Sequence, residues 1–518
     1  MTDDTIGRLA APPAWAGAQL RLRQALARWI ERSVARQRCI PWQGGHDEGS
    51  FVASWFGYYL LTGDPRILDF LRWLRDGFLD WARSHLFHGY YAEGEVHHQP
   101  ENFIFFLPRL WHADPDSRVA QALDDAAHHA GNWIDAVPPW YDWQQHRFRS
   151  WRLGTREVAA HPPYDIEHPD HFRIIQVALC ACQAVGDERY LELARDFCRR
   201  WARDILGSDA LPAVRLLTET QASHLYPPSL LHAANAGPEE RLELHIGAGT
   251  VDALLDLFAI TGDQELAAAA RKIVTSGLHL VGQPYSHPLA AAARRYRIAT
   301  GDKMLDADIV ARVPAANGDF ESAMVLAAPR GPHPMGLGQR CDQVQWMRLN
   351  DGEHWRPDER PSPAALVLAW DITGDERLAT EAMTVAAQRM ELAAALDDGR
   401  EHGCGGRSAS AIASGHGRNA GIGEVTGVLY PLALGSCRQF GADQPQVVIS
   451  CPEQAGLPQG CAALWRHCQP PRVRICNGSE EPVRLTLKFS PLRGEASPAA
   501  RKLELAPGEL YEGEAEGV

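Results

Sequence analysis

Thr62-Gly63-Asp64 separates two apolar stretches of helical periodicity, and a turn of this kind recurs along the chain. The six turns are Thr62-Gly63-Asp64, Ala113-Asp114-Pro115, Val185-Gly186-Asp187, Thr261-Gly262-Asp263, Thr300-Gly301-Asp302 and Thr373-Gly374-Asp375. A glycine just past the last residue of a helix can adopt the left-handed conformation that ends it, and an aspartate can cap the helix that follows. Turns of one form that recur through much of a chain indicate repeated helical hairpins.

The spacing of these turns, roughly 40 to 75 residues, is too wide and too irregular for a solenoid of short repeats. It suits a closed ring of helical hairpins with long loops at one end. Further helices are predicted over residues 18–36 and 421–434, and the pair around 289–313 is the least regular because it is rich in arginine. We therefore expect a mainly α domain built as an (α/α)6 toroid, with a ring of seven hairpins as the alternative.

After about residue 442 the apolar period changes from that of a helix to two. The alternating runs are Val447–Ile449, Arg472–Ile475, Val483–Leu487 and Lys502–Leu505. Short alternating runs with proline, glycine and asparagine between them predict antiparallel strands. The chain is thus expected to divide into a catalytic α/α domain at 1–441 and a small C-terminal β-sandwich domain at 442–518, which is not expected to carry the chemistry.

The composition restricts the partners of the protein. A formal net charge of −14 over 518 residues disfavours nucleic acid or an anionic membrane surface. No apolar run approaches the roughly 20 residues that span a bilayer, and the acidic N-terminus lacks the basic and apolar regions of a secretory signal. A cytoplasmic location is the simplest expectation.

The 11 cysteines show no disulfide-like spacing, and reduced cysteines fit a cytoplasmic location. One mixed set could supply zinc ligands, and it consists of Cys341, Cys404, His402 and His416. This set contains no Cys-X-X-Cys pair, which is the usual mark of a zinc site. We therefore expect neither a metal nor another cofactor.

Polar clusters precede the turns by about 12 to 18 residues, where the first helix of each hairpin is predicted to begin. They are His46–Glu48, His97–Asn102, Tyr164–His171, Glu243–His245, Tyr285–His287 and Asp358–Arg360. A helix of that length measures roughly 18 to 27 Å, so turns and clusters would lie at opposite ends of the same helices. The clusters would then meet at one rim of the ring, where converging histidines and acids indicate an active site.

A helix cap needs only one polar side chain. Glu243 and the acids of 358–359 are therefore interpreted as caps or as solvated side chains. The segments 97–102 and 164–171 differ because each carries several titratable groups beside proline. We predict that the functional residues lie in these two segments.

A closed α/α toroid followed by an antiparallel β domain resembles the six-hairpin glycosidases and the toroidal polysaccharide lyases. The resemblance covers nearly the whole chain and rests on architecture, without a diagnostic motif. It implies an oligosaccharide substrate and catalytic groups on loops at the rim of the inner helices. Loop aromatics such as Trp140, Trp143 and Trp151 suit stacking on sugar faces, although a loop tryptophan can equally cover a core.

Glycoside hydrolysis is the reaction that we expect first. It needs two carboxyl groups, one acting as an acid and the other as a base or nucleophile. The candidates are Glu101, Asp165 and Glu167, with Asp47 and Glu48 as further acids in the substrate site.

Elimination at a uronic acid is the main alternative. A lyase must neutralise the sugar carboxylate, remove the C5 proton and protonate the leaving oxygen, and in toroidal lyases, as the resemblance implies, Asn, His, Tyr and Arg take these roles. The corresponding residues here are His98, Asn102, Tyr164, His168 and Arg173, and His97 and His171 are expected to contact the substrate. Arg340 and Arg418 could clamp an acidic substrate through bidentate contacts.

Two further alternatives stay open. A sugar isomerase or epimerase also uses paired histidines as acid and base. A non-enzymatic scaffold is the contrasting class, and it is disfavoured because a purely structural ring has no need of so many histidines and acids at one rim.

Overall fold

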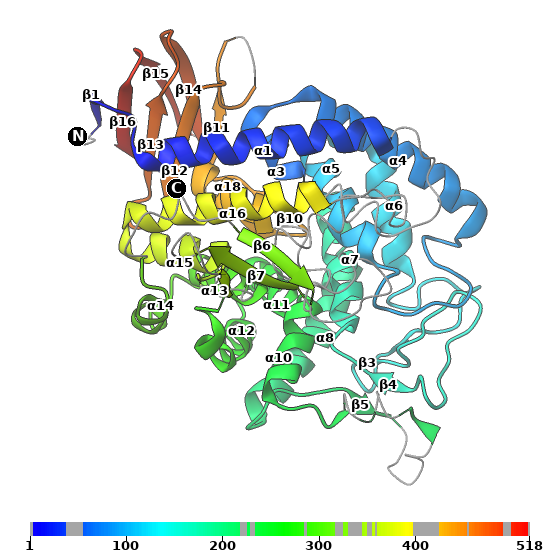
Figure 1. The fold of residues 1–518 in the computed structure, drawn as a ribbon. Coiled ribbons are helices and arrows are strands. Elements are labelled where there is room, and N and C mark those ends of the chain that lie inside the picture. The colour runs from blue at the N-terminus through cyan, green and yellow to red at the C-terminus, as the bar shows by residue number, and fades with distance from the viewer. Residues whose placement is uncertain are drawn as a thin grey trace.

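The computed structural model describes residues 4–37, 55–217, 225–227, 231, 234–283, 287–315, 325–329, 344–349, 355–357, 360–396, 424–452, 455–490 and 499–515. The described chain is mainly α, with small antiparallel sheets, which confirms the predicted class (Figure 1). The helices are α1 (Ala14–Gln37), α3 (Phe56–Thr62), α4 (Pro65–His85), η1 (Asn102–Phe106), α5 (Leu107–Ala113), α6 (Ser117–His128), α7 (His171–Val185), α8 (Glu188–Gly207), α10 (Pro238–Gly247), α11 (Thr250–Thr261), α12 (Gln264–Ser276), η3 (Leu278–Leu280), α13 (His287–Thr300), α14 (Asp306–Arg312), α15 (Pro363–Thr373), α16 (Glu376–Leu396) and α18 (Glu424–Leu434).

Five of the six predicted turns form as expected. Their glycines have φ values of 64° to 75°, all left-handed, and they are Gly63, Gly186, Gly262, Gly301 and Gly374. The following aspartate accepts the backbone N–H two residues on, as Asp64 does from Arg66 at 3.0 Å. In four turns a threonine adds to the cap: the Thr62 hydroxyl donates to the Tyr58 carbonyl at 2.7 Å and accepts the N–H of Asp64 at 3.3 Å.

The remaining turn, Ala113-Asp114-Pro115, differs from the prediction because it has no glycine. Asp114 ends α5 with φ −148° and does not cap the next helix. Asp116 caps α6 instead and accepts the N–H of Arg118 at 2.8 Å. The carboxylate of Asp114 pairs with Arg72 of α4 at 2.7 Å, so this turn is joined to the neighbouring hairpin by an ion pair.

The two helices of the α7–α8 hairpin bury their side chains differently. In α7 every residue from His171 to Ala181 is buried, whereas in α8 burial recurs at helical spacing, as at Tyr190, Phe197 and Trp201. A helix that is buried all round is enclosed by others, and an amphipathic helix covers them. In this hairpin the first helix is therefore enclosed and the second covers it, whereas the second helix α16 is itself buried all round over residues 378–387.

The first helices contact one another in succession. The contacts are α3 with α18, α18 with α15, α15 with α13, α13 with α11, α11 with α7, and α7 with η1. Among the second helices, α1 lies against α16 and α8 against α12 (Figure 1).

The polar clusters predicted at helix starts are placed unevenly. His171, His287 and Asn102 begin α7, α13 and η1 respectively, as the spacing predicts. The prediction is wrong for Glu243–His245, which lies inside α10. The reason is that α10 and α11 are separated by the left-handed Gly249, which restarts the helix at Thr250.

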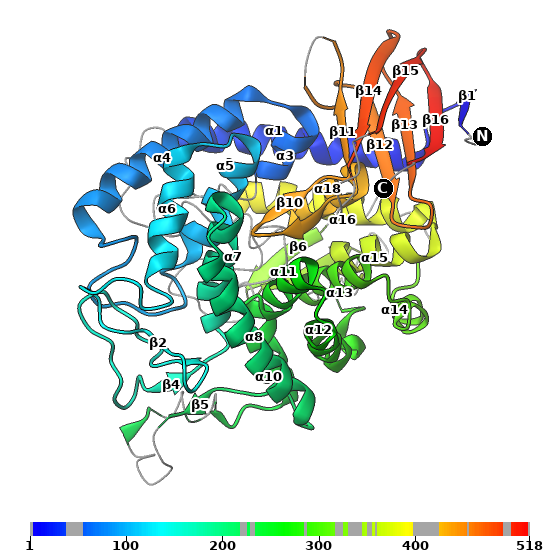
Figure 2. The same ribbon diagram turned by 180° about the vertical axis from the view of Figure 1, so that it is seen from behind.

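Strands β1 and β11 to β16 gather at one end of the molecule (Figure 2). The strands are β1 (Thr5–Arg8), β2 (Tyr141–Asp142), β3 (Arg147–Phe148), β4 (Ile166–Glu167), β5 (Arg215–Leu216), β6 (Val325–Pro329), β7 (Val344–Leu349), β8 (Trp355–Pro357), β9 (Cys437–Gln439), β10 (Ala442–Gln444), β11 (Val447–Ser450), β12 (Cys461–Arg466), β13 (Arg472–Asn477), β14 (Val483–Phe489), β15 (Ala499–Leu505) and β16 (Glu509–Glu514). The four alternating runs form β11, β13, β14 and β15, as predicted. One sheet has the order β1-β16-β13-β12 and another the order β11-β14-β15.

Two features of these sheets were not predicted. Strand β1 comes from the N-terminal end of the chain and pairs antiparallel with β16, so that Thr5 lies opposite Glu512. Strand β12 does not alternate, because its residues 461–465 are all buried. The β6-β7-β8 sheet is a further unpredicted element.

The β9–β10 hairpin is inserted between helices, and the expected domain boundary at 441/442 falls at its tip. Phe440 donates its N–H to Asp256 of α11 at 2.9 Å, and the Gly441 carbonyl accepts from Arg109 of α5 at 2.9 Å. The Cys180 thiol of α7 donates to the Phe440 carbonyl at 3.3 Å. The hairpin tip therefore joins three helices.

No single helix in the described ranges is both long enough and apolar enough to cross a membrane. One pair, α10 with α11, reaches the required length and composition together but is bent by 56°.

The turn glycines give a matched stability test. Alanine at Gly262 meets no atom within 4 Å and carries only the strain of φ 69°, about 1–2 kcal/mol. Alanine at Gly63 carries the same strain and would also place its Cβ 2.3 Å from the Ala455 carbonyl oxygen, beyond β11. We expect Gly63→Ala to lower the free energy of unfolding clearly more than Gly262→Ala in urea titrations. Equal losses would show that the sheets are not seated rigidly on this turn.

Four buried histidines predict a loss of stability in mild acid. Burial lowers the pKa of each to about 4, and they are His112, His129, His245 and His467. The unfolded chain binds these protons near pH 6.5, so stability is fully present above that pH and falls as the pH drops from about 6.5 to about 4. We expect a loss on the order of 1–2 kcal/mol per histidine at pH 5. Urea unfolding at pH 7 and pH 5 measures it, and His467→Gln should reduce the difference.

Candidate functional site

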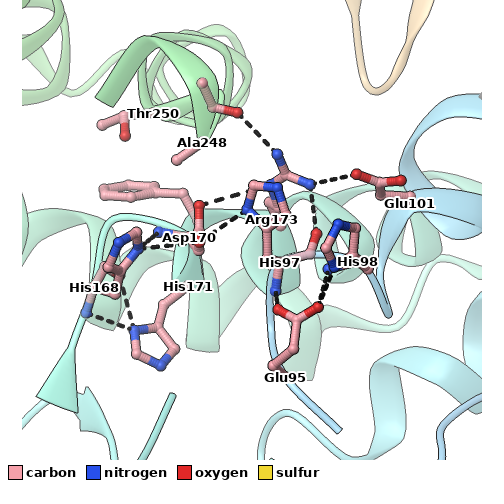
Figure 3. A network of polar contacts seen from close by, with 12 residues as sticks. Glu95, His97, His98, Glu101, His168, Asp170, His171, Arg173, Ala248 and Thr250 are labelled. Atoms are coloured by element: carbon pink, nitrogen blue, oxygen red, sulfur yellow. Dashed lines mark hydrogen bonds and ion pairs between the residues drawn. The ribbon is translucent and has the colours of Figure 1, made fainter. Parts of the chain in front are cut away.

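The two polar segments chosen from the sequence lie together at the starts of η1 and α7 (Figure 3). The Nδ1 atom of His97 is 3.0 Å from Oδ2 of Asp170, and Nη1 of Arg173 donates to Oε1 of Glu101 at 2.8 Å. The contact between His97 and Asp170 joins the segments at the protein surface, and the contact between Arg173 and Glu101 joins them below it. We refer to the side chains of Glu95, His97, His98, Glu101, His168, Asp170 and Arg173 as the rim network.

Asp170 is the carboxylate on which two histidines converge. It directly precedes α7, but its side chain makes no capping bond. Its Oδ2 lies 3.0 Å from Nδ1 of His97 and 3.1 Å from Nδ1 of His168, and it accepts the indole N–H of Trp151 at 3.4 Å. Burial acts to raise the pKa of Asp170, but the two histidines outweigh burial and hold it well below the ordinary value. Asp170 is therefore an ionised, buried anchor.

The two histidines on this anchor keep part of their surface exposed. The exposed side-chain fraction is 31% for His97 and 13% for His168. His171, in contrast, is fully buried: its Nε2 donates to the Ser150 carbonyl at 2.8 Å, and its Nδ1 accepts the backbone N–H of His168 at 3.1 Å. Burial lowers the pKa of His171. Its contacts fix the loop that carries His168, and its expected contact with substrate stays a prediction.

A second histidine–carboxylate pair lies beside the first. His98, 46% exposed, bonds Oε1 of Glu95 through Nδ1, and its ring stands edge-on to that of His97 at 4.6 Å. Glu95 also accepts the backbone N–H of His98 at 3.0 Å. Burial acts to raise the pKa of Glu95, but the hydrogen bond and charge of His98 outweigh it and lower the pKa. Glu95 was not singled out from the sequence.

Arg173 is the centre of the rim network. Its side chain is buried and donates to Glu101, to the His97 carbonyl and, at 3.1 Å, to the Gly247 carbonyl of α10. It therefore joins the starts of η1 and α7 to the end of α10. Glu101 is fully buried in this contact.

Asp165 and Glu167 are also buried, but their contacts lead away from the two histidines. Asp165 accepts the Tyr226 hydroxyl at 2.8 Å. Glu167 lies in β4 and binds Arg200 of α8, with Arg215 of β5 at 3.6 Å. The two guanidinium groups thus hold Glu167 as an anchor of the β4–β5 hairpin. Its catalytic role stays a prediction.

The expected aromatic residues take three different positions. Trp140 is fully buried in the core, and Trp143, 37% exposed, packs with Trp133 and Tyr141 away from the rim network. Trp151 contacts Asp170 and lies beside His168, with ring centroids 6.3 Å apart. The ring of Tyr164 is 4.7 Å from the guanidinium of Arg152.

Several predicted residues lie outside the description. Asn102 begins η1, but its side chain is not described. Outside the described residues altogether are Asp47, Glu48, Arg340, Arg418 and the set Cys341, Cys404, His402 and His416. Among the residues that are described, no group of three or more His, Cys, Asp or Glu is arranged to hold a metal ion.

A cavity of about 200 Å³ lies next to the rim network, between the first helices and the β9–β10 hairpin. Arg173 lines it on the side of the rim network, together with Gln176 and the backbone of 247–249. The cavity is also lined by arginines that sequence reasoning missed, namely Arg109, Arg294, Arg295 and Arg438. The one sequence feature that pointed toward these arginines was the pair Arg294-Arg295 in the irregular segment 289–313.

No protein-family model matches the chain, and no curated protein matches it by sequence. The site is therefore interpreted from its own geometry. It combines a buried carboxylate between two partly exposed histidines with a cavity lined by guanidinium groups. The first part is suited to moving a proton and the second to holding an acidic group.

The placement of Glu167 can be tested by stability. Glu167→Gln removes the charge that Arg200 and Arg215 face, and we expect it to lower the free energy of unfolding by about 1–3 kcal/mol. The control is Glu157→Gln, since Glu157 is 58% exposed and 4.0 Å from His161; it should change stability by less than about 0.5 kcal/mol. Urea titration of both variants measures the difference. A Glu167→Gln protein as stable as the wild type would contradict the structural role.

Proposed function

We propose that the protein is a carbohydrate-active enzyme whose helices close into an α/α toroid with a β-sandwich at one end. The succession of contacts from α3 through α18, α15, α13, α11 and α7 to η1 supports the ring. Helix α4 contacts both α3 and α5 and so bridges the remaining interval. In this arrangement α18 and α1 make a seventh hairpin, because α18 contacts α3 and α15 inside while α1 contacts α16 outside.

The reaction that the geometry favours is β-elimination at a uronic acid. The observation that carries it is Asp170, bound to His97 and His168 beside a cavity lined by arginines. In this reaction a base removes the C5 proton, the released electron pair forms the C4–C5 double bond, and the C4–O bond breaks. An acid then protonates the leaving oxygen, which becomes the hydroxyl of the departing sugar.

We assign His97 as the base and His168 as the acid. The Nδ1 of His97 faces the ionised carboxylate of Asp170, which can only accept, so the proton of neutral His97 sits on Nδ1 and the lone pair on Nε2. Nδ1 of His168 accepts the backbone N–H of Asp170 at 3.0 Å, so the proton that His168 donates sits on Nε2. The loop at Asp170 thus orients one histidine as a base and the other as an acid.

Hydrolysis, the reaction first expected from the sequence, is the second candidate. Its three carboxylates are buried and already bonded to Arg173, Tyr226 and Arg200, which disfavours them as a working acid and base. One observation still favours it. Glu101 and Asp170 flank the guanidinium of Arg173 at 2.8 and 3.9 Å, so two carboxylates contact the one rim-network side chain that lines the cavity. Isomerisation would use the same two histidines as elimination and is separated from it by product.

The discriminating experiment is product analysis on a panel of uronate-containing and neutral oligosaccharides. Elimination gives ultraviolet absorbance from the new C4–C5 double bond together with new reducing ends. New reducing ends without that absorbance would establish hydrolysis, and an isomer of unchanged mass would establish isomerisation. No product from any substrate would reject the proposal.

Asp170→Asn tests the assigned anchor. We expect the elimination rate to fall by about 10²–10⁴-fold, because both histidines lose their charged partner. The bell-shaped dependence of the wild-type rate on pH should also be lost in this variant. Asp196→Asn is the matched control, since Asp196 bonds His146 at 2.6 Å in another part of the molecule, and its activity should stay at the wild-type level. Equal rates for the two variants would remove Asp170 from the mechanism.

A further inference from the structure

Five buried donor atoms that have no hydrogen-bond partner in the described part of the chain belong to side chains around one cavity. They are Nε of Arg109, Arg173 and Arg438, Nη2 of Arg294, and the hydroxyl of Ser436. A buried donor left without an acceptor costs about 1–3 kcal/mol, and folded proteins rarely keep one. Five such donors around one cavity indicate a ligand that is rich in acceptor oxygens.

The charges of these arginines favour an anionic ligand. Arg294 pairs with Asp371 at 2.7 Å, and Arg438 lies 3.2 Å from Asp252. Arg109 differs, because its described hydrogen bonds go only to the carbonyls of Phe105 and Gly441. Burial lowers the pKa of Arg109 to about 10, and the charges of Asp443 and Asp252 offset only part of this effect, as expected for a cation that has no acid in ion-pair contact among the described residues. One carboxylate would supply that counter-ion and accept from the other donors.

The shape of the cavity limits what can enter. The β9–β10 hairpin contributes Ser436, Arg438 and Asp443 to the lining, and its tip bonds to α5, α7 and α11. A chain of sugars therefore cannot pass between the helices to the far side. The lining also includes small side chains, among them Ala291, Ala292 and Ala364, which suit the flat face of a sugar ring. A space of about 200 Å³ suits one sugar residue and not several.

We propose that this cavity is a closed subsite for the carboxylate of a single terminal uronate residue. The carboxylate lies among Arg109, Arg438 and Ser436, and the sugar ring extends toward Arg173 and the rim network. The protein consequently acts from a chain end and releases one residue at a time. This assignment rests on the proposed function for its substrate class, but its binding step can be measured without turnover.

The test is calorimetric titration with free hexuronates (glucuronate, galacturonate and mannuronate) and with the neutral sugar glucose. We expect at least one hexuronate to bind at least tenfold more tightly than glucose. Arg109→Lys and Arg438→Lys keep a positive charge but lose the planar fork, and each should weaken that binding about tenfold or more. Arg297→Lys is the matched control, because Arg297 pairs with Asp306 and does not line the cavity, and it should bind as the wild type does.

Melting temperatures establish that each variant is folded, and Ser436→Ala replaces any arginine variant that is not. The proposal is overturned if no hexuronate binds, if glucose binds equally well, or if the cavity variants bind like Arg297→Lys.

Release of single residues from a uniform oligouronide is expected from the first minutes, and a ladder of intermediate sizes would overturn the chain-end assignment. Hexuronate binding without turnover would reject the proposed function and support the subsite. Turnover by the wild type, with unaltered hexuronate binding in the cavity variants, would support the proposed function and reject the subsite.

Discussion

The buried guanidinium of Arg173 is the contact on which the rest of the rim depends. It bonds Glu101, the His97 carbonyl and the Gly247 carbonyl at once, and so fixes three helix ends that are distant in sequence. Removing such a charge from water is costly, and only several well-directed acceptors offset that cost. The position of His97 relative to Asp170 follows from this arrangement, since the backbone of His97 is held by Arg173 while its ring is held by Asp170.

The same physical requirement extends into the space between the helices. Arg294 with Asp371 and Arg295 with Asp252 and Asp256 are ion pairs with almost fully buried arginines, where an apolar core would be the simpler solution. Replacing buried ion pairs by apolar side chains is often neutral or stabilising, so stability alone does not explain them. A chain that keeps charged groups beside a cavity is consistent with selection for binding.

The hairpins could be predicted from the sequence because their signals are local. A glycine and an aspartate in succession specify the end of one helix and the cap of the next, wherever the chain lies. Segments 97–102 and 164–171 were chosen for a similar local signal, because several titratable groups beside proline exceed what a cap needs; the structure brings them together, and their function stays a prediction. The role of each carboxylate could not be predicted, since it depends on the partner: Glu167 meets Arg200 from another helix, 33 residues away. The cavity was invisible because Arg109, Arg294 and Arg438 share no local pattern.

The pairing of β1 with β16 has a consequence for the order of folding. Asp4 and Tyr511 lie in contact although they are 507 positions apart in the chain. During synthesis β1 must therefore wait, without a partner strand, until almost all of the remaining chain has emerged. Contacts of such long range are formed late and slow the approach to the native state, and an exposed strand edge invites pairing with other chains. The helical hairpins, whose contacts are local, can form well before this sheet is complete.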